Sequence, residues 1–464
     1  MTRVVRSGAC ALLVALVGAL SMSTAFAATG PITVTTAGTT LVAPNVACTG
    51  DPAAAPGNLP KGITIRASNV TVVNPKVTNC QRGISIEKTS TGAIPSNVRI
   101  IGDASRPGYS VSELRHNRNS IFVQRLYGGE IGDVSEDGTD GGRPFINDTW
   151  KFVEVEASQN LLIDDLTGNC GTTVWKAQWN PGNKPGCFFG IKWLSKRATG
   201  APHLISSNTV SDVRLTGVTE ETISFDGHFN TANMSSNVAT DTVASRDAGA
   251  NRLGLSDADW ASVTENLTGQ YVNVVDGTQQ GKYLRILSRS KNTFTVDDPN
   301  NVIGAMANGN KVSVGQTYAG NRVLSNTINS QGGKVHIDFH VVGVNSRIAG
   351  NTLTGTNSFR YGAGVMHLRQ LNGTDAPQCI NVRTGFFPPA SIGGKTVGIQ
   401  RIGLSANNSV VGNSCQHGDI SLTLATWTAP PSGFTSQNYW ASNTFSNGQL
   451  VTYQNRLLAT DGAR

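Results

Sequence analysis

The chain has 464 residues, of which 14% are charged, 6% are aromatic and 52 are glycine. Lysine and arginine total 37 against 30 aspartates and glutamates, without a dense basic run, which argues against a nucleic-acid-binding protein. The small basic excess fits either an acidic substrate or an ordinary soluble surface.

The first 27 residues predict a secretory signal peptide. Arg3 and Arg6 precede an apolar run over residues 9–20, and a small-residue cleavage pattern follows at 25–27. The run is too short to span a bilayer comfortably, so a membrane anchor is not expected. We therefore expect a secreted protein that leaves the membrane after cleavage and folds as one domain over residues 28–464.

Six cysteines remain after the signal peptide, and an even number in an oxidising compartment suggests disulfide bonds. None of them shows the CxxC spacing of a zinc or redox site. Among the roughly 15 connectivities that six cysteines allow, proximity in the sequence favours Cys48–Cys80, Cys170–Cys187 and Cys379–Cys415.

A recurring corner motif indicates the kind of β fold. An apolar residue, two variable residues, Asn or Asp, Thr or Ser, and an apolar residue recur around Asn208, Asp241, Asn326, Asn351 and Asn413, with a looser copy at Asn443. A β-sandwich has no reason to repeat one corner residue. A solenoid does, because stacked Asn side chains can hydrogen-bond from coil to coil.

Short strands with alternating apolar residues follow most of these corners, and most lie about 30 to 40 residues apart, as expected for one coil with its loops. They are 84–87, 121–124, 153–156, 189–192, 223–226, 335–338, 366–369 and 420–423. Corners and strands together resemble the right-handed parallel β-helix of the pectate-lyase-like superfamily over roughly residues 60–455. We therefore expect an all-β chain with this solenoid fold.

One stretch interrupts the rhythm of the repeats. Strands at 271–275, 282–287 and 293–296, joined by turns of the hairpin type, predict a small inserted β module over residues 248–318. The insert could cover the flank of the solenoid or form a wall of its groove, because insertions into loops serve either purpose.

Alternation predicts which side chains point outward. The first and third residues of each strand are expected in the core, and the second and fourth on the outer face, about 4.8 Å apart from coil to coil. The central strands place these charged or titratable residues outward: Glu154, Glu156, Lys192, Asp226, His336, Asp338, His367 and Arg369, with His228 and His340 at the next outward positions. Such a set fits proton transfer to a substrate. An ordinary cross-strand ion-pair ladder is the structural alternative.

The first chemistry that fits is β-elimination on a uronic-acid polysaccharide, which needs a base beside a neutralised carboxylate and an acid for the leaving oxygen. The set is similar to that of β-helix polysaccharide lyases, which use a Lys and an Arg with Ca²⁺ held by acidic residues. This resemblance implies Lys192 as the base and Arg369 as the clamp or acid. It also implies Ca²⁺, the one cofactor suggested, with Glu154, Glu156 and Asp226 as its ligands.

The second chemistry is glycoside hydrolysis by Asp226 and Asp338, for which the separation of the two carboxyl groups selects the mechanism. The corner-like motifs at Asp241 and Asn326 leave open whether the two strands are neighbours or are separated by a further coil.

A non-catalytic carbohydrate-binding or adhesin-like solenoid is the third interpretation. Trp175, Trp179 and Trp193 lie near Lys192 in the sequence, and such side chains either stack on sugar rings or pack a loop onto the fold. We predict an extracellular polysaccharide as the partner and a secreted lyase as the activity, with a hydrolase as the alternative. The candidate substrate contacts are Glu154, Glu156, His228, His340 and Trp193.

Overall fold

The computed structural model describes most of the chain beyond the predicted signal peptide. The described residues are 28–53, 60–134, 145–176, 185–194, 205–226, 239–263, 266–315, 318–333, 335–340, 343–357, 366–367, 370–371, 374–387, 391–392, 395–396, 401–403, 405–426, 436–451 and 455–457. Residues 1–27, where the signal peptide is predicted, lie outside this set. No helix among the described residues is long and apolar enough to cross a membrane.

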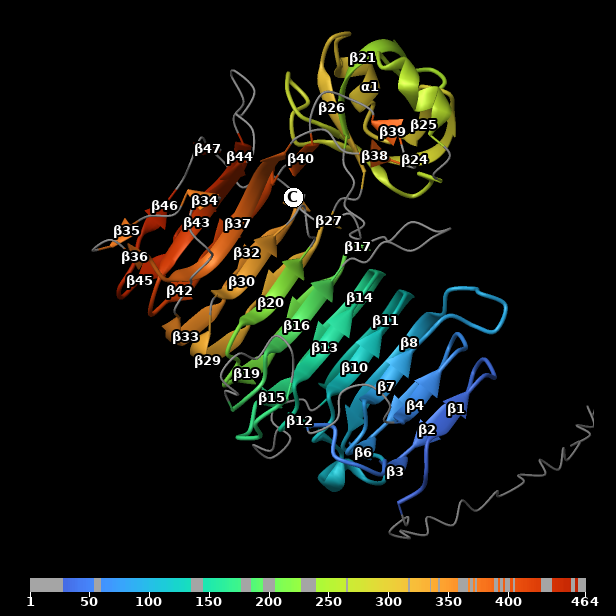
Figure 1. Cartoon of the computed structure of the whole chain (residues 1–464), viewed down its shortest axis with the longest axis vertical. Coiled ribbons are helices and arrows are strands. Elements are labelled where there is room, and N and C mark those ends of the chain that lie inside the picture. Colours follow the sequence, from blue (N-terminus) through green and yellow to red (C-terminus); the bar gives the residue numbers. More distant parts are fainter. Residues whose placement is uncertain are drawn as a thin grey trace, which may run out of the picture.

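The described chain is built mainly from three parallel β-sheets, which we call sheets 1, 2 and 3 (Figure 1). The chain visits the three sheets in turn, so each complete coil adds one strand to sheets 1 and 3 and one or two strands to sheet 2. An all-β fold of stacked parallel sheets is thereby confirmed, and the arrangement is consistent with a parallel β-helix.

Sheet 1 carries the face that concerns function. Its parallel strands are β1 (Ile32–Val34), β4 (Lys61–Ile65), β7 (Arg82–Ile86), β10 (Asn119–Val123), β13 (Lys151–Val155), β16 (Phe189–Leu194), β20 (Glu221–Asp226), β30 (Val335–His340), β37 (Gln378–Phe387), β43 (Asp419–Thr426) and β46 (Leu450–Val451). Two short strands pair antiparallel at its end, namely β34 (Met366–His367) with β43 and β40 (Arg401–Gly403) with β37.

Sheets 2 and 3 complete each coil. Sheet 2 contains β2 (Thr40–Val42), β5 (Thr71–Val73), β8 (Ser96–Asp103), β11 (Leu126–Val134), β14 (Ser158–Asp164), β17 (Ile205–Ser206), β18 (Thr209–Ser211), β27 (Tyr318–Ala319), β28 (Arg322–Leu324), β31 (Gly343–Val344), β32 (Arg347–Ala349), β41 (Asn408–Val411), β44 (Ser436–Ala441) and β47 (Asn455–Leu457). Sheet 3 contains β3 (Asn45–Ala47), β6 (Lys76–Thr78), β9 (Glu113–Arg115), β12 (Ile146–Asn147), β15 (Thr167–Asn169), β19 (Arg214–Thr216), β29 (Thr327–Gly333), β33 (Thr352–Asn357), β42 (Ser414–Cys415) and β45 (Thr444–Phe445).

The core lies between the three sheets and consists of side chains that stack from coil to coil. In sheet 1, Ile191 pairs in register with Val153 and Ile223, and all three are fully buried. Branched apolar side chains pack well on such a pleated, covered surface, which is why these segments form strands. The inward direction predicted for these positions is confirmed.

Stacked asparagines line two corners of the coils. In one column, Asn326, Asn351, Asn413 and Asn443 donate and accept side-chain hydrogen bonds of 2.8 to 2.9 Å from each coil to the next. Asn208 belongs to a second column, where its amide donates to Asn321 at 3.0 Å. These ladders confirm the corner role that the repeat predicted for Asn residues.

Asp241 is not a corner residue, so the expectation drawn from its motif was wrong. It lies on β21 (Ala239–Asp247), the first strand of the inserted module, where it accepts hydrogen bonds from Trp260 Nε1 and Ser256 Oγ. No coil therefore lies between β20 and β30, which pair directly in parallel, with Ser224 opposite Asp338. This settles the spacing that the sequence left open.

The inserted module is a closed antiparallel barrel that begins earlier in the chain than residue 248. Its strands are β21, β22 (Arg252–Leu255), β23 (Tyr271–Val274), β24 (Tyr283–Ser290), β25 (Thr293–Asp297) and β26 (Lys311–Gly315), with the short helix α1 (Val302–Ala305) after β25. It has its own apolar core around Trp260 and Phe294 and lies beside β17 and β27 (Figure 1). Two short hairpins, β35 (Gln370–Leu371) with β36 (Thr374–Asp375) and β38 (Ser391–Ile392) with β39 (Lys395–Thr396), complete the described strands.

The three predicted disulfide bonds are present as Cys48–Cys80, Cys170–Cys187 and Cys379–Cys415. Cys48 and Cys80 follow corresponding strands of successive coils, β3 and β6, so that bond ties two coils together. Disulfide bonds are typical of oxidising compartments and are compatible with a secreted protein.

Candidate functional site

The outer face of sheet 1 carries a column of polar residues over its central strands. Lys192 on β16 pairs in register with Ser224 on β20, which pairs with Asp338 on β30, and Asp338 pairs with Asn381 on β37. All four side chains are buried, although they belong to the side of the strands opposite the core. Polar side chains are therefore buried on the outer face of this sheet as well as inside the solenoid.

Five ionisable side chains gather in this region, and we call Lys192, Glu221, Asp226, Asp338 and Arg383 the charge cluster. Lys192 Nζ lies 2.8 Å from Glu221 Oε2 and 2.7 Å from Asp226 Oδ2. Arg383 donates to Asp338 Oδ2 at 2.8 Å. No side chain of the cluster is more than 5% exposed. Charges so far removed from water are costly unless they are paired.

The three carboxylates of the charge cluster outnumber its two cations, so full ionisation would leave one uncompensated negative charge. Burial raises the pKa of Asp338 to about 8, and the nearby Glu221 and Asp226 act in the same direction against Arg383. At neutral pH Asp338 therefore holds a proton, which balances the cluster. The pKa of Glu221 is lowered because the Lys192 ammonium outweighs the effect of burial.

Lys192 is a cation in this setting rather than a base. Burial alone would lower its pKa, but the Asp226 and Glu221 carboxylates raise it above the ordinary value. Its ammonium also lies 3.7 Å from the centre of the Phe189 ring, a contact that further favours the charged form. A general base needs a pKa near the working pH, so that its unprotonated form is present. The carboxylates around Lys192 keep its amine protonated instead.

The structure brings together three of the predicted site residues, Lys192, Asp226 and Asp338, with register shifts relative to the prediction. The predicted strands 189–192, 223–226 and 335–338 have Gly190, Ser224 and His336 as their second residues, which would then lie side by side. In the structure, Lys192 and Asp338 are the residues that lie beside Ser224. Residues 366–367, the described part of the expected coil strand, instead pair antiparallel with β43, and β37 lies beside β30.

Glu221 and Arg383 were missed by sequence reasoning. Alternation counted back from Ile223 places Glu221 on the inner side, yet its carboxylate bonds Lys192 on the outer face. Arg383 is the last residue of an alternating run that begins at Ile380. The run at 366–369 has the same pattern and was predicted as the strand in its place.

His336 does not belong to the charge cluster, which corrects its assignment to the outer column. Its Nε2 lies 2.7 Å from the Thr354 carbonyl oxygen and 3.1 Å from Ser330 Oγ, and both partners belong to strands of sheet 3. Burial lowers the pKa of His336 to about 4, so the ring is neutral at neutral pH. The first residues of β30 come out of the corner from sheet 3, and the simple alternation fails there.

Trp193 is a core residue and does not stack on sugar rings, which corrects its prediction as a substrate contact. Its indole stacks on Phe225 with ring centres 4.4 Å apart, and its Nε1 donates to Ser158 Oγ at 2.9 Å. Because Trp193 follows outward-pointing Lys192, strand alternation turns it inward.

The remaining predicted contacts are only partly described. His340 pairs through its backbone with Asp226, and His367 pairs with Leu424. His228 and Arg369 lie outside the described residues.

Glu154, Glu156 and Asp226 do not fit a Ca²⁺ site. Glu154 accepts hydrogen bonds from Lys151 and from Asn119, and Asp226 is bound by Lys192, so cations already neutralise both. Glu154 and Asp226 lie on β13 and β20, which β16 separates, roughly 10 Å apart across the sheet. Ca²⁺ needs oxygens at about 2.3–2.6 Å. Nowhere in the described residues do three or more His, Cys, Asp or Glu side chains form a metal-binding group.

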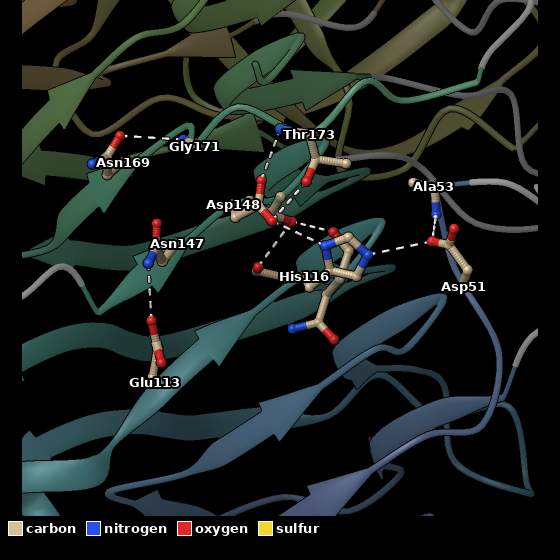
Figure 2. A network of polar contacts seen from close by, with 12 residues as sticks. Asp51, Ala53, Glu113, His116, Asn147, Asp148, Asn169, Gly171 and Thr173 are labelled. Atoms are coloured by element: carbon tan, nitrogen blue, oxygen red, sulfur yellow. Dashed lines mark hydrogen bonds and ion pairs between the residues drawn. The ribbon is translucent and has the colours of Figure 1, made fainter. Parts of the chain in front are cut away.

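A second polar network, which the sequence did not suggest, lies at the corner between sheets 3 and 1 (Figure 2). His116 Nδ1 is 3.0 Å from Asp148 Oδ2, and its Nε2 is 3.3 Å from Asp51 Oδ1. Thr173 Oγ1 also donates to Asp148 at 2.7 Å. The network connects segments from four parts of the chain, which indicates a role in fixing this corner.

Comparison with known protein families and with curated proteins found no match for the chain. The fold alone does not assign a function, because unrelated activities occur on the same fold.

Proposed function

We propose that the chain is a secreted enzyme of the right-handed parallel β-helix type that cleaves glycosidic bonds in an extracellular polysaccharide by hydrolysis. Asp338 is the general acid, and Asp226 is the carboxylate that acts as base or nucleophile. The observation that carries this proposal is the charge cluster, in which three carboxyl groups share one buried site with two cations, and burial raises the pKa of Asp338 to about 8.

The positions of the two carboxyl groups support this assignment. Because β20 and β30 are neighbours and Ser224 lies opposite Asp338, Asp226 and Asp338 are diagonal neighbours. Their Cα atoms are then about 8 Å apart, from the spacing of strands and of residues along them. Two carboxyl groups placed so can flank one glycosidic bond.

The chemistry follows from the two protonation states. Asp338 gives its proton to the glycosidic oxygen as the bond to the anomeric carbon breaks. As a base, the Asp226 carboxylate takes a proton from the water that bonds to that carbon from the other side; as a nucleophile, it bonds to the carbon itself, and water then replaces it. Lys192 keeps Asp226 ionised, and Arg383 orients the Asp338 carboxyl group. Pairs of carboxyl groups whose environments separate their pKa values are typical of such acid and base roles.

Substrate must reach a face that is closed in this structure, since the cluster side chains are at most 5% exposed. Exclusion of water strengthens the electrostatic interactions within such a site. The buried Ser224 hydroxyl, which has no hydrogen-bond partner within the described chain, lies in register between Lys192 and Asp338 and is available to a substrate hydroxyl.

β-Elimination on a uronic-acid polymer is the second candidate, and the two buried cations favour it. Lys192 or Arg383 could neutralise a substrate carboxylate once its own partner is displaced. The raised pKa of Lys192 argues against the base role that the sequence suggested for it.

The test is to incubate the purified chain with neutral and uronate polysaccharides while measuring both new reducing ends and the ultraviolet absorbance of unsaturated products. Hydrolysis predicts reducing ends without that absorbance, and their loss by at least a hundredfold in Asp338→Asn and in Asp226→Asn. The control is Asp212→Asn, which removes an exposed carboxylate at the corner that follows β18. Formation of unsaturated products would show that the activity is elimination and not hydrolysis. Binding of a glycan without either product would favour a non-catalytic solenoid.

A further inference from the structure

A cavity of about 340 Å³ lies where the inserted barrel meets sheet 2, away from the charge cluster. The barrel contributes Tyr271, Tyr283 and Arg285, and the solenoid contributes Asn160, Ser207 and Asn345 among others. This volume is at the lower end of the roughly 300–1,000 Å³ typical of small-ligand sites.

The barrel is fixed to the solenoid beside this cavity. Tyr271, Ala319 and Val344 form a small buried apolar cluster, with Tyr283 packed against it. The Tyr271 hydroxyl contacts Ser206 and Gln159, which are themselves joined by a hydrogen bond of 2.9 Å. The walls of the cavity are therefore held in place by apolar packing and by polar contacts.

Gly320 lies beside two residues that line the cavity, Ser207 and Tyr283. It occupies a left-handed corner, with φ of 65°, between Ser207 and Asn345 in the neighbouring coils, since the Ser207 amide donates to the Ala319 carbonyl and the Gly320 amide to the Val344 carbonyl. A Cβ atom at residue 320 would lie 3.7 Å from Ser207 Oγ and 3.8 Å from the Tyr283 hydroxyl. A side chain longer than Cβ would therefore meet these two lining residues.

The absence of a side chain at Gly320 also interrupts the side-chain contacts along this corner. Elsewhere on it, Asn97 donates to Asn69 at 3.1 Å, and Asn407 donates to Asn345. Among the described residues, the Asn160 amide and the Tyr283 hydroxyl, which line the cavity, make no hydrogen bond. Amide and hydroxyl groups left open in a preformed polar pocket are suited to a ligand with many hydroxyls.

We propose that this cavity is a binding site for one sugar unit of a glycan, distinct from the cleavage site. The faces of Tyr271 and Tyr283, whose ring centres are 5.5 Å apart at 73°, offer an apolar surface for a sugar ring. Asn160, Ser207 and the Tyr283 hydroxyl take its hydroxyl groups. A purely apolar ligand would leave these polar groups unpaired.

The charged residues of the cavity indicate which sugar is preferred. Arg285 is paired with Asp297 at 3.1 Å, and Asp298 accepts from the backbone amides of Val302 and Ile303 at the start of α1. Among the described residues, the Lys282 ammonium has no carboxylate partner. A sugar unit that carries a carboxylate would complement it, so a uronate unit is expected to bind more tightly than a neutral one.

This inference shares the substrate class of the proposed function, but it is tested without turnover. Short neutral and uronate oligosaccharides are titrated into the full chain carrying Asp338→Asn, and binding is followed by calorimetry. Gly320→Asn should weaken binding at least tenfold, because Asn accepts the left-handed conformation and fills the cavity. Gly412→Asn is the matched control, with φ of 64° and open space around the added Cβ.

Further variants test the details. Tyr283→Ala should weaken binding of both sugars, whereas Lys282→Met should weaken only the uronate, by about fivefold. The inference is overturned if no oligosaccharide binds, or if binding is unchanged in both Gly320→Asn and Tyr283→Ala. Absence of cleavage by the unsubstituted chain, with sugar binding at this cavity intact, would reject the proposed function alone.

Discussion

Asp338 lies on the outer face of sheet 1 with a proton that its surroundings hold in place. Burial, assisted by Glu221 and Asp226, raises its pKa to about 8, while an unfolded aspartate titrates at about 3.9. Between these values the folded chain binds a proton that the unfolded chain has released. The stabilisation is therefore fully present below about pH 4 and is lost as the pH rises through about 8.

Asp338→Asn removes this pH dependence because an amide stays neutral. We expect the free energy of unfolding of the unsubstituted chain to fall between about pH 5 and about pH 8, by up to about 1.4 kcal/mol per pH unit from this group. The variant should show a shallower fall in urea unfolding at the same pH values. Equal slopes in the two proteins would mean that Asp338 is ionised, which would also remove its role as an acid.

Lys192 is expected to contribute to stability through two carboxylates at once. Lys192→Met leaves Glu221 and Asp226 buried without their cation, which should cost about 3–5 kcal/mol at neutral pH. The cost should shrink in acid, where the carboxylates can take up protons. Denaturant unfolding at neutral and at acidic pH measures the two costs. The control is Lys282→Met, which removes an exposed ammonium and should change the free energy of unfolding by less than about 0.5 kcal/mol. A small effect at Lys192 would indicate that the cluster is hydrated.

At the level of the elements, the asparagine corners hold successive coils together. The buried Asn351 side chain donates to the Val323 carbonyl at 3.0 Å and to Asn413 at 2.8 Å, and it accepts from Asn326. Asn351→Ala leaves these groups without partners, at a cost of about 1–3 kcal/mol for each buried group left unsatisfied. Thermal unfolding should show a clear loss, whereas the exposed neighbouring Thr352→Ala should have almost no effect.

The sequence predicted the elements well where one periodic rule governs them. Corner asparagines repeat through the later coils, and stacked Ile and Val residues repeat through the core, so Asn351 and Ile223 could be assigned from pattern alone. The same rule failed where a strand begins, because the backbone is still leaving the corner at Glu221 and His336. The residues around Asp241 match the corner motif, although Asp241 lies on a strand of the barrel.

The charge cluster could be predicted only in part for the same reason. Lys192, Asp226 and Asp338 occupy regular outward positions, but their partners depend on which strand lies next to which. Arg383 reaches Asp338 because β37 is the strand that pairs with β30 on the side away from β20. Burial of the outer face, which sets the pKa of Asp338, has no signature in the local sequence.

At the scale of the whole molecule, the barrel is an addition to a single coil. Its first and last strands pair with each other, with Ala239 opposite Val314, so its two ends lie close together. Replacement of residues 239–315 by a short Gly-Ser linker should leave the solenoid folded, as judged by circular dichroism, and should abolish sugar binding at the junction. A chain that no longer folds without the barrel would show that the Tyr271 and Tyr283 contacts are essential for the solenoid.

The direct pairing of β20 with β30 also has a consequence for the order of folding. The chain leaves sheet 1 at Asp226 and returns at Val335, and an open loop of that length is entropically costly to close, by an amount that grows as about (3/2)RT ln n. A barrel that folds first joins Ala239 to Val314 and turns this long loop into a short one. The folded module would then hold β20 and β30 close together before they pair. The residues of the charge cluster on these two strands would make contact only after that step.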